Sequence, residues 1–461
     1  MQAAYQLTQH PCGSKREFWA LSWPLMIGIL SSTFMLFVDR LFLARWNPLG
    51  LNAAVNAGMA YFIFLVIPMG VVEISEVLVG RLHGEMRHHE IGKASWQMVL
   101  MSLCLLPVFG LIAWLGPMLL FQGSSNELYE TQYFRTLMLF CAAFQCATIG
   151  LSGFFIGIGN VKIVTYSAIL GNIVNITLDY WFIFGGGPIP ELGVIGAAAA
   201  TGISQIIQML FMLCLYWSQK NREKYGTTKL SFYRPFLSEG LRIGLPSGMG
   251  RSIEVVAHFL FFRIVASVGP EQMTLVAVAQ SIYILSSFVI DAQCKTASAI
   301  VSNLLGANEH ASLSKVLRSG FTLHSVYFLL ILGVVWFFPA QIFSLFSPKE
   351  GEVLQMTPEL MHTFERALIA MSLFFLLDGF GWVLTGFLTA AKDTRFVFWA
   401  SLLINWIAYV PPTLWFIGWN KGGADVAWAI VVFVTSLTVG VYLWRYLSGG
   451  WLKYEHSHPV L

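Results

Sequence analysis

The chain has 461 residues, of which 56% are hydrophobic and 11% are charged, and its formal net charge is +3. Soluble domains carry about 25% charged residues, so this composition excludes an ordinary soluble protein and indicates a polytopic membrane protein. No basic run with interleaved aromatic residues is present, so nucleic acid is not an expected partner.

The apolar segments predict about twelve membrane spans, because a bilayer core of about 30 Å is crossed by about 20 helical residues. The spans of the first half are expected near 17–45, 52–79, 93–119, 132–157, 163–184 and 194–217. Those of the second half are expected near 241–268, 273–301, 316–338, 361–389, 396–417 and 425–446. The predicted fold class is therefore an all-α polytopic membrane protein. The first apolar run is longer than the roughly 7–15 residues of a signal-peptide core, so we interpret it as a span.

The most polar stretch lies between the halves, at residues 218–240, and is interpreted as a linker. Its basic residues are Lys220, Arg222, Lys224, Lys229 and Arg234. Short cytoplasmic loops carry an excess of Lys and Arg, and the other basic turns follow even-numbered spans. We therefore predict a multi-pass protein of the inner (cytoplasmic) membrane. Both termini, flanked by Lys15 and Lys453, are expected on the cytoplasmic side.

Several features of the first half recur in the second, which indicates an internal repeat. The matched pairs are 20–25 with 241–246, 80–88 with 301–310, 153–160 with 386–393, and Asn172 with Asn405. Each half has an even number of spans, so the halves have the same topology and are related by an axis along the membrane normal. We predict two pseudo-symmetric six-helix lobes around a central cavity, an N-lobe at 1–217 and a C-lobe at 241–461.

Asp39 in the first span is a candidate functional residue, because a charge at membrane depth costs several kcal/mol and usually faces a cavity and a partner. Asn172, Asn175 and Asp179 form one stripe of span five, and Thr201 lies among small residues of span six. Oxygen ligands of this kind suit a hard cation, and two close carboxylates also suit a proton. These residues do not distinguish Na⁺ from H⁺ as the bound ion. The alternative is a buried hydrogen-bond network that holds spans one and five together.

The candidates of the second half are Glu254 in span seven and Asp378 in span ten. Arg251 precedes Glu254 by three residues, so the two side chains can neutralise each other on one helix face. No basic residue lies within one turn of Asp378. Asp378 is therefore predicted to bind a cation or proton, and Glu254 either to do so or to pair with Arg251.

Other charged side chains of the spans receive structural interpretations. Asp291 and Lys295 stand at i, i+4 in span eight and are predicted to neutralise each other. Glu73 and Glu76 lie towards the inner end of span two, where they are expected to reach the membrane interface.

Sequence motifs of enzymes are missing, since the chain has no Walker A, HExxH or GxSxG pattern. Gly157 and Gly159 begin a GxGxxG pattern, but Lys162 replaces its last glycine at the end of a span. We expect neither ATP-driven transport nor enzymatic activity, and no cofactor beyond the coupling ion.

Several segments together resemble the multidrug and toxic compound extrusion (MATE) family. They are the first span with Pro24 and Asp39, the Gly157–Gly159 end of span four, the run from Asn172 to Tyr180, and Pro188-x-Pro190 with the following Leu-Gly-Val-x-Gly. The resemblance covers essentially the whole chain. It implies export of organic cations and other drugs in exchange for Na⁺ or H⁺.

The resemblance also implies roles for the candidate residues. Asp39, Asn175, Asp179 and Thr201 match the N-lobe cation and proton site of the family, and the first three would hold Na⁺ in a sodium-coupled member. Asn172 is kept with them as a binding candidate. Glu254 and Asp378 match the C-lobe acidic positions of the NorM-type branch. The chain departs from the family pattern at Arg40, at the end of span one, and in the Arg251 beside Glu254.

The function predicted from the sequence is antiport by alternating access, in which a cation gradient drives export of hydrophobic, often cationic compounds. Pro24 is the predicted hinge, because proline removes one helix hydrogen bond. The expected partners are small-molecule drugs and the lipid bilayer, and the protein is expected to be a monomer. The alternatives are a lipid-linked oligosaccharide flippase of the same broad superfamily, a non-transporting receptor or scaffold, and a membrane enzyme.

Overall fold

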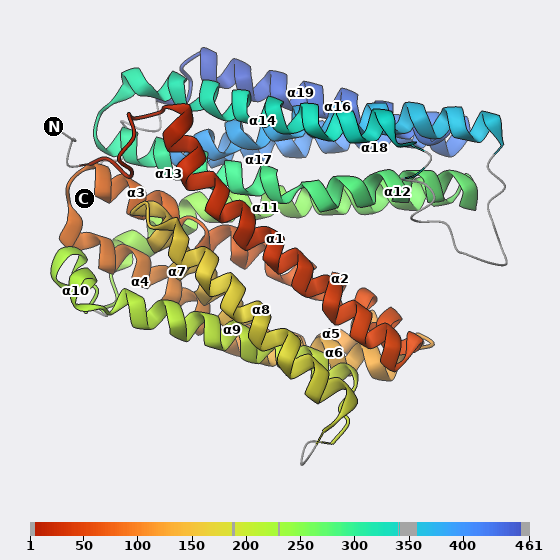
Figure 1. Cartoon of the computed structure of the whole chain (residues 1–461), viewed down its shortest axis with the longest axis horizontal. Coiled ribbons are helices and arrows are strands. Elements are labelled where there is room, and N and C mark those ends of the chain that lie inside the picture. The colour runs from red at the N-terminus through yellow and green to blue at the C-terminus, as the bar shows by residue number, and fades with distance from the viewer. Residues whose placement is uncertain (1–4, 187–189, 229–230, 340, 342–356, 453–461) are drawn as a thin grey trace.

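The computed structural model describes residues 5–186, 190–228, 231–339, 341 and 357–452, and every regular element among them is a helix (Figure 1). Pro188, Lys229 and Lys453, which enter the sequence predictions, lie outside the described residues. The predicted all-α fold class is confirmed.

The helices of the first half match the first six predicted spans. They are α1 Lys15–Trp46, α2 Pro48–Val72, α3 Ser75–Gly84, α4 His88–Cys104, α5 Leu106–Leu120, α6 Glu127–Phe140, α7 Ala142–Gly157, α8 Val161–Phe184 and α9 Val194–Tyr216. Spans two, three and four are each built from two helices in succession. The short helix α10 Gln219–Tyr225 lies in the predicted linker.

The helices of the second half match the last six predicted spans. They are α11 Arg234–Ala266, α12 Pro270–Ser286, α13 Phe288–Gly306, η1 His310–Ser312, α14 Leu313–Phe337, α16 Pro358–Ala390, α17 Thr394–Leu403, η2 Ile404–Tyr409, α18 Val410–Thr413, η3 Leu414–Trp419 and α19 Ala424–Leu447. The segments η2 and η3 are π-helical turns inside one continuous span, on either side of Pro411 and Pro412.

Nine helical segments of the described residues are long and apolar enough to cross a membrane, and two bent helix pairs bring the number to eleven. Helix α11 adds the twelfth segment, because its 33 residues rise far enough to cross a bilayer. Its charged residues, Arg251 and Glu254 among them, make it the least apolar of the set. The prediction of twelve spans in two six-helix lobes is thereby confirmed.

The two lobes lie together at the end of the molecule that carries both termini and spread apart at the other end (Figure 1). We call these the closed end and the open end. Helix α2 of the N-lobe packs on α11 of the C-lobe, and α1 packs on α13. Helix α11 is the first span of the C-lobe, as α1 is of the N-lobe, and α13 belongs to the second span, as α2 does. Each contact therefore joins the first span of one lobe to the second span of the other, and the pseudo-two-fold axis relates the two contacts. Helices α3 and α13 pack on each other between them.

Glycines allow this interface to form with the backbones in close contact. A Cβ on Gly70 would lie 2.5 Å from the Cα of Gly248, and a Cβ on Gly84 would overlap the carbonyl of Asn303. The sequence repeat that pairs 80–88 with 301–310 therefore brings equivalent segments face to face. Small residues at such positions are what allow membrane helices to approach closely.

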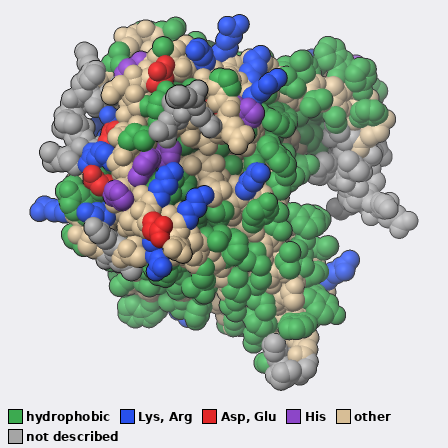
Figure 2. Space-filling view, turned by 60° about the vertical axis from the view of Figure 1, so that its left-hand side comes forward, with side chains coloured by type: hydrophobic (Ala, Val, Ile, Leu, Met, Phe, Trp, Pro, Cys, Tyr) green, Lys and Arg blue, Asp and Glu red, His purple; other side chains and the backbone are tan. Residues whose placement is uncertain are grey.

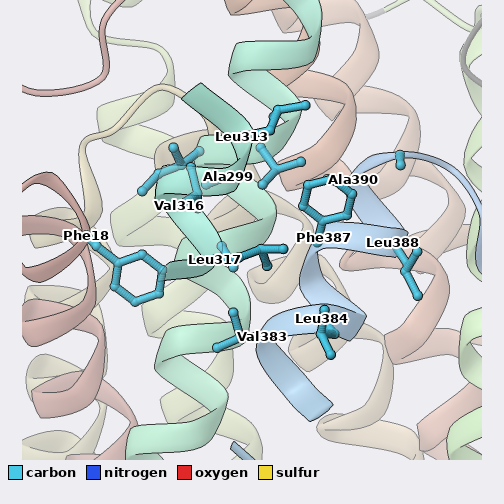
Figure 3. Close-up of a cluster of buried hydrophobic side chains, with 14 of the residues drawn as sticks. Phe18, Ala299, Leu313, Val316, Leu317, Val383, Leu384, Phe387, Leu388 and Ala390 are labelled. Atoms are coloured by element: carbon cyan, nitrogen blue, oxygen red, sulfur yellow. The ribbon is translucent and has the colours of Figure 1, made fainter. Parts of the chain in front are cut away.

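A buried apolar cluster ties the start of α1 to the C-lobe. Phe18 lies against α14 in a buried cluster that also contains side chains of α13 and α16, including Val383 and Phe387 (Figure 3). The second half of α1 packs instead along α8. Helix α1 thus touches both lobes, and its two halves have different neighbours.

The predicted hinge residue Pro24 lies at the change of neighbours along α1. The helix continues through Pro24 to Trp46. The Thr165 hydroxyl of α8 donates to the Pro24 carbonyl at 2.6 Å. This contact fixes α1 against α8 at the proline, and a bend there stays a prediction.

The surface separates apolar from basic side chains. Large apolar side chains are exposed along the spans, for example Leu119, Ile173 and Phe337. Basic side chains gather over the closed end, and a hollow separates the apolar flanks of the two lobes (Figure 2). This distribution fits helices whose outer faces contact lipid.

Candidate functional site

The N-lobe places two buried carboxyl groups in direct contact. Asp39 of α1 is 4% exposed and Asp179 of α8 is 0% exposed. Their carboxyl groups are within hydrogen-bond reach of each other. With its amide nitrogen turned towards them, Asn175 donates to Asp39 Oδ1 at 2.8 Å and to Asp179 Oδ2 at 3.2 Å. Spans one and five therefore meet at these residues, as predicted. We call Asp39, Asn175 and Asp179 the N-lobe acid site.

Helical periodicity explains why α8 supplies two members of this site. Asn175 and Asp179 are four residues apart, so their side chains lie on one face of the helix. Asn172 lies one turn nearer the closed end, and its amide donates to the Ser31 hydroxyl of α1. Helix α8 thus contacts α1 twice, through the acids and, one to two turns nearer the closed end, through the uncharged pair of Asn172 and Ser31.

Thr201 of α9 is placed differently. It is half-buried, and its hydroxyl donates to the carbonyl of Ala197 in its own helix at 3.0 Å. Among the described residues, the hydrogen bonds that join the acids to Asn175 do not include the Thr201 hydroxyl. The structure therefore brings the acids and Asn175 together without Thr201.

The N-lobe acid site has the chemistry of a site for one small cation. Two ionised carboxylates in contact repel each other strongly unless a proton or a metal cation lies between them. Oδ1 of Asp179 has no hydrogen-bond partner among the described residues. A buried acceptor without a partner carries a free-energy cost that a bound proton or cation removes. Within the described part of the chain, no group of three or more His, Cys, Asp and Glu side chains is arranged to hold a metal ion.

The C-lobe encloses a cavity of about 170 Å³ that contains the other two candidate acids. Its polar lining includes Arg251, Glu254, Tyr283, Asp378 and Ser401. Each acid has its own hydroxyl partner, since Tyr283 donates to Asp378 Oδ2 at 2.7 Å and Ser401 donates to Glu254 Oε1 at 3.1 Å. The two acids therefore share a cavity, and each is stabilised separately.

The internal repeat relates one of these contacts to a contact in the N-lobe. Tyr61 precedes Gly84 by as many residues as Tyr283 precedes the matched Gly306, so the two tyrosines occupy equivalent positions. By the same reasoning from the matched Gly153 and Gly386, Gln145 is equivalent to Asp378. Tyr61 donates to Gln145 Oε1 at 2.7 Å, the same length as the bond from Tyr283 to Asp378. The fold thus repeats this hydrogen bond with a neutral acceptor in the N-lobe and an acidic acceptor in the C-lobe.

Arg251 does not form the ion pair with Glu254 that the sequence spacing offered as an alternative. Arg251 Nη1 lies 2.5 Å from Glu73 Oε2, at the junction of α2 and α3, and the guanidinium also lies over the Trp382 ring. The neutralising Arg251–Glu254 pair is therefore not what forms. Helical spacing described only neighbours on α11, and tertiary packing offered Arg251 a carboxylate on another helix.

Lys295 shows the same departure. The predicted partner was Asp291, one turn earlier, but Lys295 Nζ lies 2.9 Å from Glu73 Oε1. Asp291 remains within electrostatic range of the ammonium group. Glu73 is thus held inside the protein between two cations, and Glu76 is 7% exposed, so the expectation that both reach the membrane interface is wrong.

Tyr283 and Ser401 were missed by reasoning from the sequence. A hydroxyl in an apolar span is common and carries no distinguishing pattern. The signal that points to Tyr283 is the repeat, which pairs it with Tyr61 at the same distance from a matched glycine. No such signal marks Glu73, whose partners come from the other half of the chain.

Most of the chain is similar to known proteins. The model of the MatE family matches residues 24–181 and 246–415. A relative from Pseudomonas aeruginosa, described as a probable multidrug resistance protein NorM, is 25% identical over 438 residues, which cover 92% of this chain and 87% of the relative.

Two solved structures show the same fold. One is described as an outward-facing conformation of a multidrug resistance MATE family transporter of the MOP superfamily. It has a TM-score of 0.82, is 20% identical, and matches over 99% of this chain and 100% of its own. The other is a MOP superfamily transporter from Pyrococcus furiosus whose binding pocket is described as having reverse polarity. It has a TM-score of 0.83, is 20% identical, and matches over 98% of this chain and 99% of its own.

Proposed function

Since the chain belongs to the MATE family of multidrug efflux transporters, we propose that it is an antiporter that exports small organic compounds in exchange for H⁺ or Na⁺. The observation that carries this proposal is the contact between Asp39 and Asp179 with Asn175 bridging them. Charges at this depth are costly, and a pair of like charges is costlier still. Such a pair persists when a cation occupies it during the functional cycle.

The ion is exchanged for the drug because both depend on the same carboxylates. A proton or Na⁺ at the N-lobe acid site leaves the pair with a single negative charge, which removes the repulsion between the two carboxylates and holds α1 against α8. A cationic drug approaching the N-lobe competes for the same negative charge, so loading one expels the other.

Alternating access follows from the two lobes. Both termini and the 218–240 linker lie on the cytoplasmic side of the inner membrane in this proposal, so the open end faces outward. Release of the drug then occurs towards the outside, and the lobes must separate at the closed end to load it. Exposed aromatic and Met side chains of α1 and α2, such as Phe34, Phe37 and Met59, would supply apolar surface for hydrophobic compounds.

The flippase alternative needs basic side chains free to bind pyrophosphate in the central cavity. Arg251 and Lys295 face the contact between the two lobes, and both are bonded to Glu73. Their charge is therefore already occupied, which favours drug export over a pyrophosphate-bearing substrate.

The experiment is drug efflux from proteoliposomes with pH and Na⁺ gradients imposed one at a time. The proposal predicts that one of the two gradients drives efflux of a cationic dye and that the other has no effect. Asp39→Asn, which removes the exchangeable charge, should abolish the gradient-driven part. Efflux that needs neither gradient would overturn antiport.

A further inference from the structure

Glu73 stands where the second span breaks between α2 and α3, and both of its ion pairs cross from the N-lobe to the C-lobe. Glu73 Oε2 lies 2.5 Å from Arg251 Nη1 of α11, and Oε1 lies 2.9 Å from Lys295 Nζ of α13. One carboxylate thus joins two C-lobe helices to the N-lobe, using both of its oxygens.

Close backbone contacts between the lobes surround these three residues. On the open side, a Cβ on Gly70 would lie 2.5 Å from Gly248, and one on Gly244 would lie 2.5 Å from the Cα of Val71. On the closed side, a Cβ on Gly80 would overlap the Ser302 side chain. The ion pairs therefore sit within backbone contacts that exist only while the lobes are together.

The three side chains are screened from solvent but not sealed from it. Those of Glu73, Arg251 and Lys295 are 13%, 27% and 19% exposed. Pairs of this kind are stronger than surface ion pairs, yet water can reach them when the lobes move. Separating the lobes at the closed end would take the carboxylate of Glu73 away from both cations, which is costly for partly buried charges.

We propose that Glu73, Arg251 and Lys295 form an inter-lobe lock that holds the closed end shut and that has to open once in every transport cycle. The proposal rests on the alternating access of the proposed function. It does not depend on which ion drives transport. Glu73 is the central member, because removing it deprives both cations of their partner at once.

The lock gives a role to Asp291, which the sequence spacing predicted as the partner of Lys295. Lys295 is in electrostatic range of Glu73, Glu76 and Asp291 together. When Glu73 moves away with the N-lobe, Asp291 remains on the same helix and can take up the ammonium group. The C-lobe therefore carries a substitute partner for the open state of the lock.

The test measures access to the closed end with a polar maleimide, using purified full-length protein with its six native cysteines replaced. Ser302→Cys is the reporter, because Ser302 is fully buried at the lobe interface beside Gly80. We expect Glu73→Gln to raise its labelling rate at least about fivefold, the shift expected for loss of about 1 kcal/mol. Lys295→Met should also raise it, and the double variant should label no faster than Glu73→Gln.

Two controls separate the lock from general loosening. Glu85→Gln makes the same chemical change in a glutamate that pairs with Arg81 and Arg87 inside the N-lobe, so it should leave the labelling of Ser302→Cys unchanged. A second reporter, Ser102→Cys, lies buried on α4, where the Ser102 hydroxyl donates to the Met98 carbonyl of its own helix, and should stay protected in every variant.

Unchanged labelling of Ser302→Cys in folded Glu73→Gln and Lys295→Met proteins would overturn the lock. Equal increases at Ser302→Cys and Ser102→Cys would overturn it too, since they would show a structural role only. The measurement uses neither a drug nor an ion gradient, so its failure is distinct from a failure of antiport, which is judged by efflux alone.

Discussion

The two lobes use one helical framework for two different acid arrangements. In the N-lobe, Asp39 and Asp179 touch each other across two helices, with Asn175 as their bridge. In the C-lobe, Glu254 and Asp378 share a cavity, but each accepts a hydrogen bond from its own hydroxyl group. The N-lobe pair needs an added cation for its charges to coexist, whereas the C-lobe acids are each stabilised by the protein.

From this difference we propose unequal roles for the two lobes. An ion that enters the N-lobe site acts directly on the contact between α1 and α8, and α1 also packs on α13 of the C-lobe. Ion loading there can move a helix that touches both lobes. In this proposal the C-lobe acids tune binding inside one lobe. Substitutions in both lobes test this inequality, from the largest expected effect to the smallest.

The largest effect is expected for Asp39→Asn. This change imitates the protonated acid and leaves the side-chain volume nearly unchanged, so the protein should fold while gradient-driven efflux falls to the level of empty liposomes. Asp179→Asn should behave alike, and the double variant should be no worse than either single one, because the acids act as a unit. Efflux that falls additively would show that they are independent.

A smaller loss is expected for Asp378→Asn. Its amide oxygen can still accept the Tyr283 hydroxyl, so only the charge disappears from the cavity. Efflux should fall by roughly tenfold, which corresponds to about 1.4 kcal/mol, and the yield of folded protein should hardly change. If Asp378→Asn proved as inactive as Asp39→Asn, the inequality of the lobes would be refuted.

The repeated tyrosine offers a matched comparison of the two lobes. Tyr283→Phe removes a hydrogen bond to a carboxylate, worth about 1.5–3 kcal/mol, and Tyr61→Phe removes one to the neutral Gln145, worth about 0.5–1.5 kcal/mol. Thermal unfolding in detergent should therefore show a larger destabilisation for Tyr283→Phe. Equal shifts would indicate that Asp378 is neutral in the resting protein.

The smallest effect is expected for Thr201→Ala. Its hydroxyl donates to its own helix, so efflux should stay within about twofold of the unaltered protein and stability within about 0.5 kcal/mol. Thr177→Ala is the control, because Thr177 makes the same contact on the exposed face of α8. A large loss confined to Thr201→Ala would show that this hydroxyl turns to the acids when the ion binds.

The sequence predicted the spans, and the contact between spans one and five at Asp39 and Asp179, for a physical reason. Apolar runs of fixed length report helices that cross a bilayer, and a carboxylate among apolar residues is costly enough to mark a site. The four-residue spacing of Asn175 and Asp179 is by itself enough to place both side chains on one helix face.

The sequence failed for contacts that depend on tertiary packing. Arg251 and Lys295 each have an acidic neighbour one turn away, and local spacing predicts pairing with it. Both bond instead to Glu73, more than 170 residues earlier, because the lobes fold together at the glycine contacts. Only the packing of the two halves reveals that a carboxylate at a helix break reaches these cations.

The most direct measurement is ion release when a cationic drug binds to the purified protein in weakly buffered solution, followed for H⁺ and Na⁺ separately. Competition for the N-lobe acid site predicts release of about one coupling ion per drug molecule, since the pair shares a single charge. Asp39→Asn should release none, whereas Asp378→Asn should still release it. Release from Asp39→Asn equal to that of the unaltered protein would contradict the central claim that drug and ion exchange at Asp39 and Asp179.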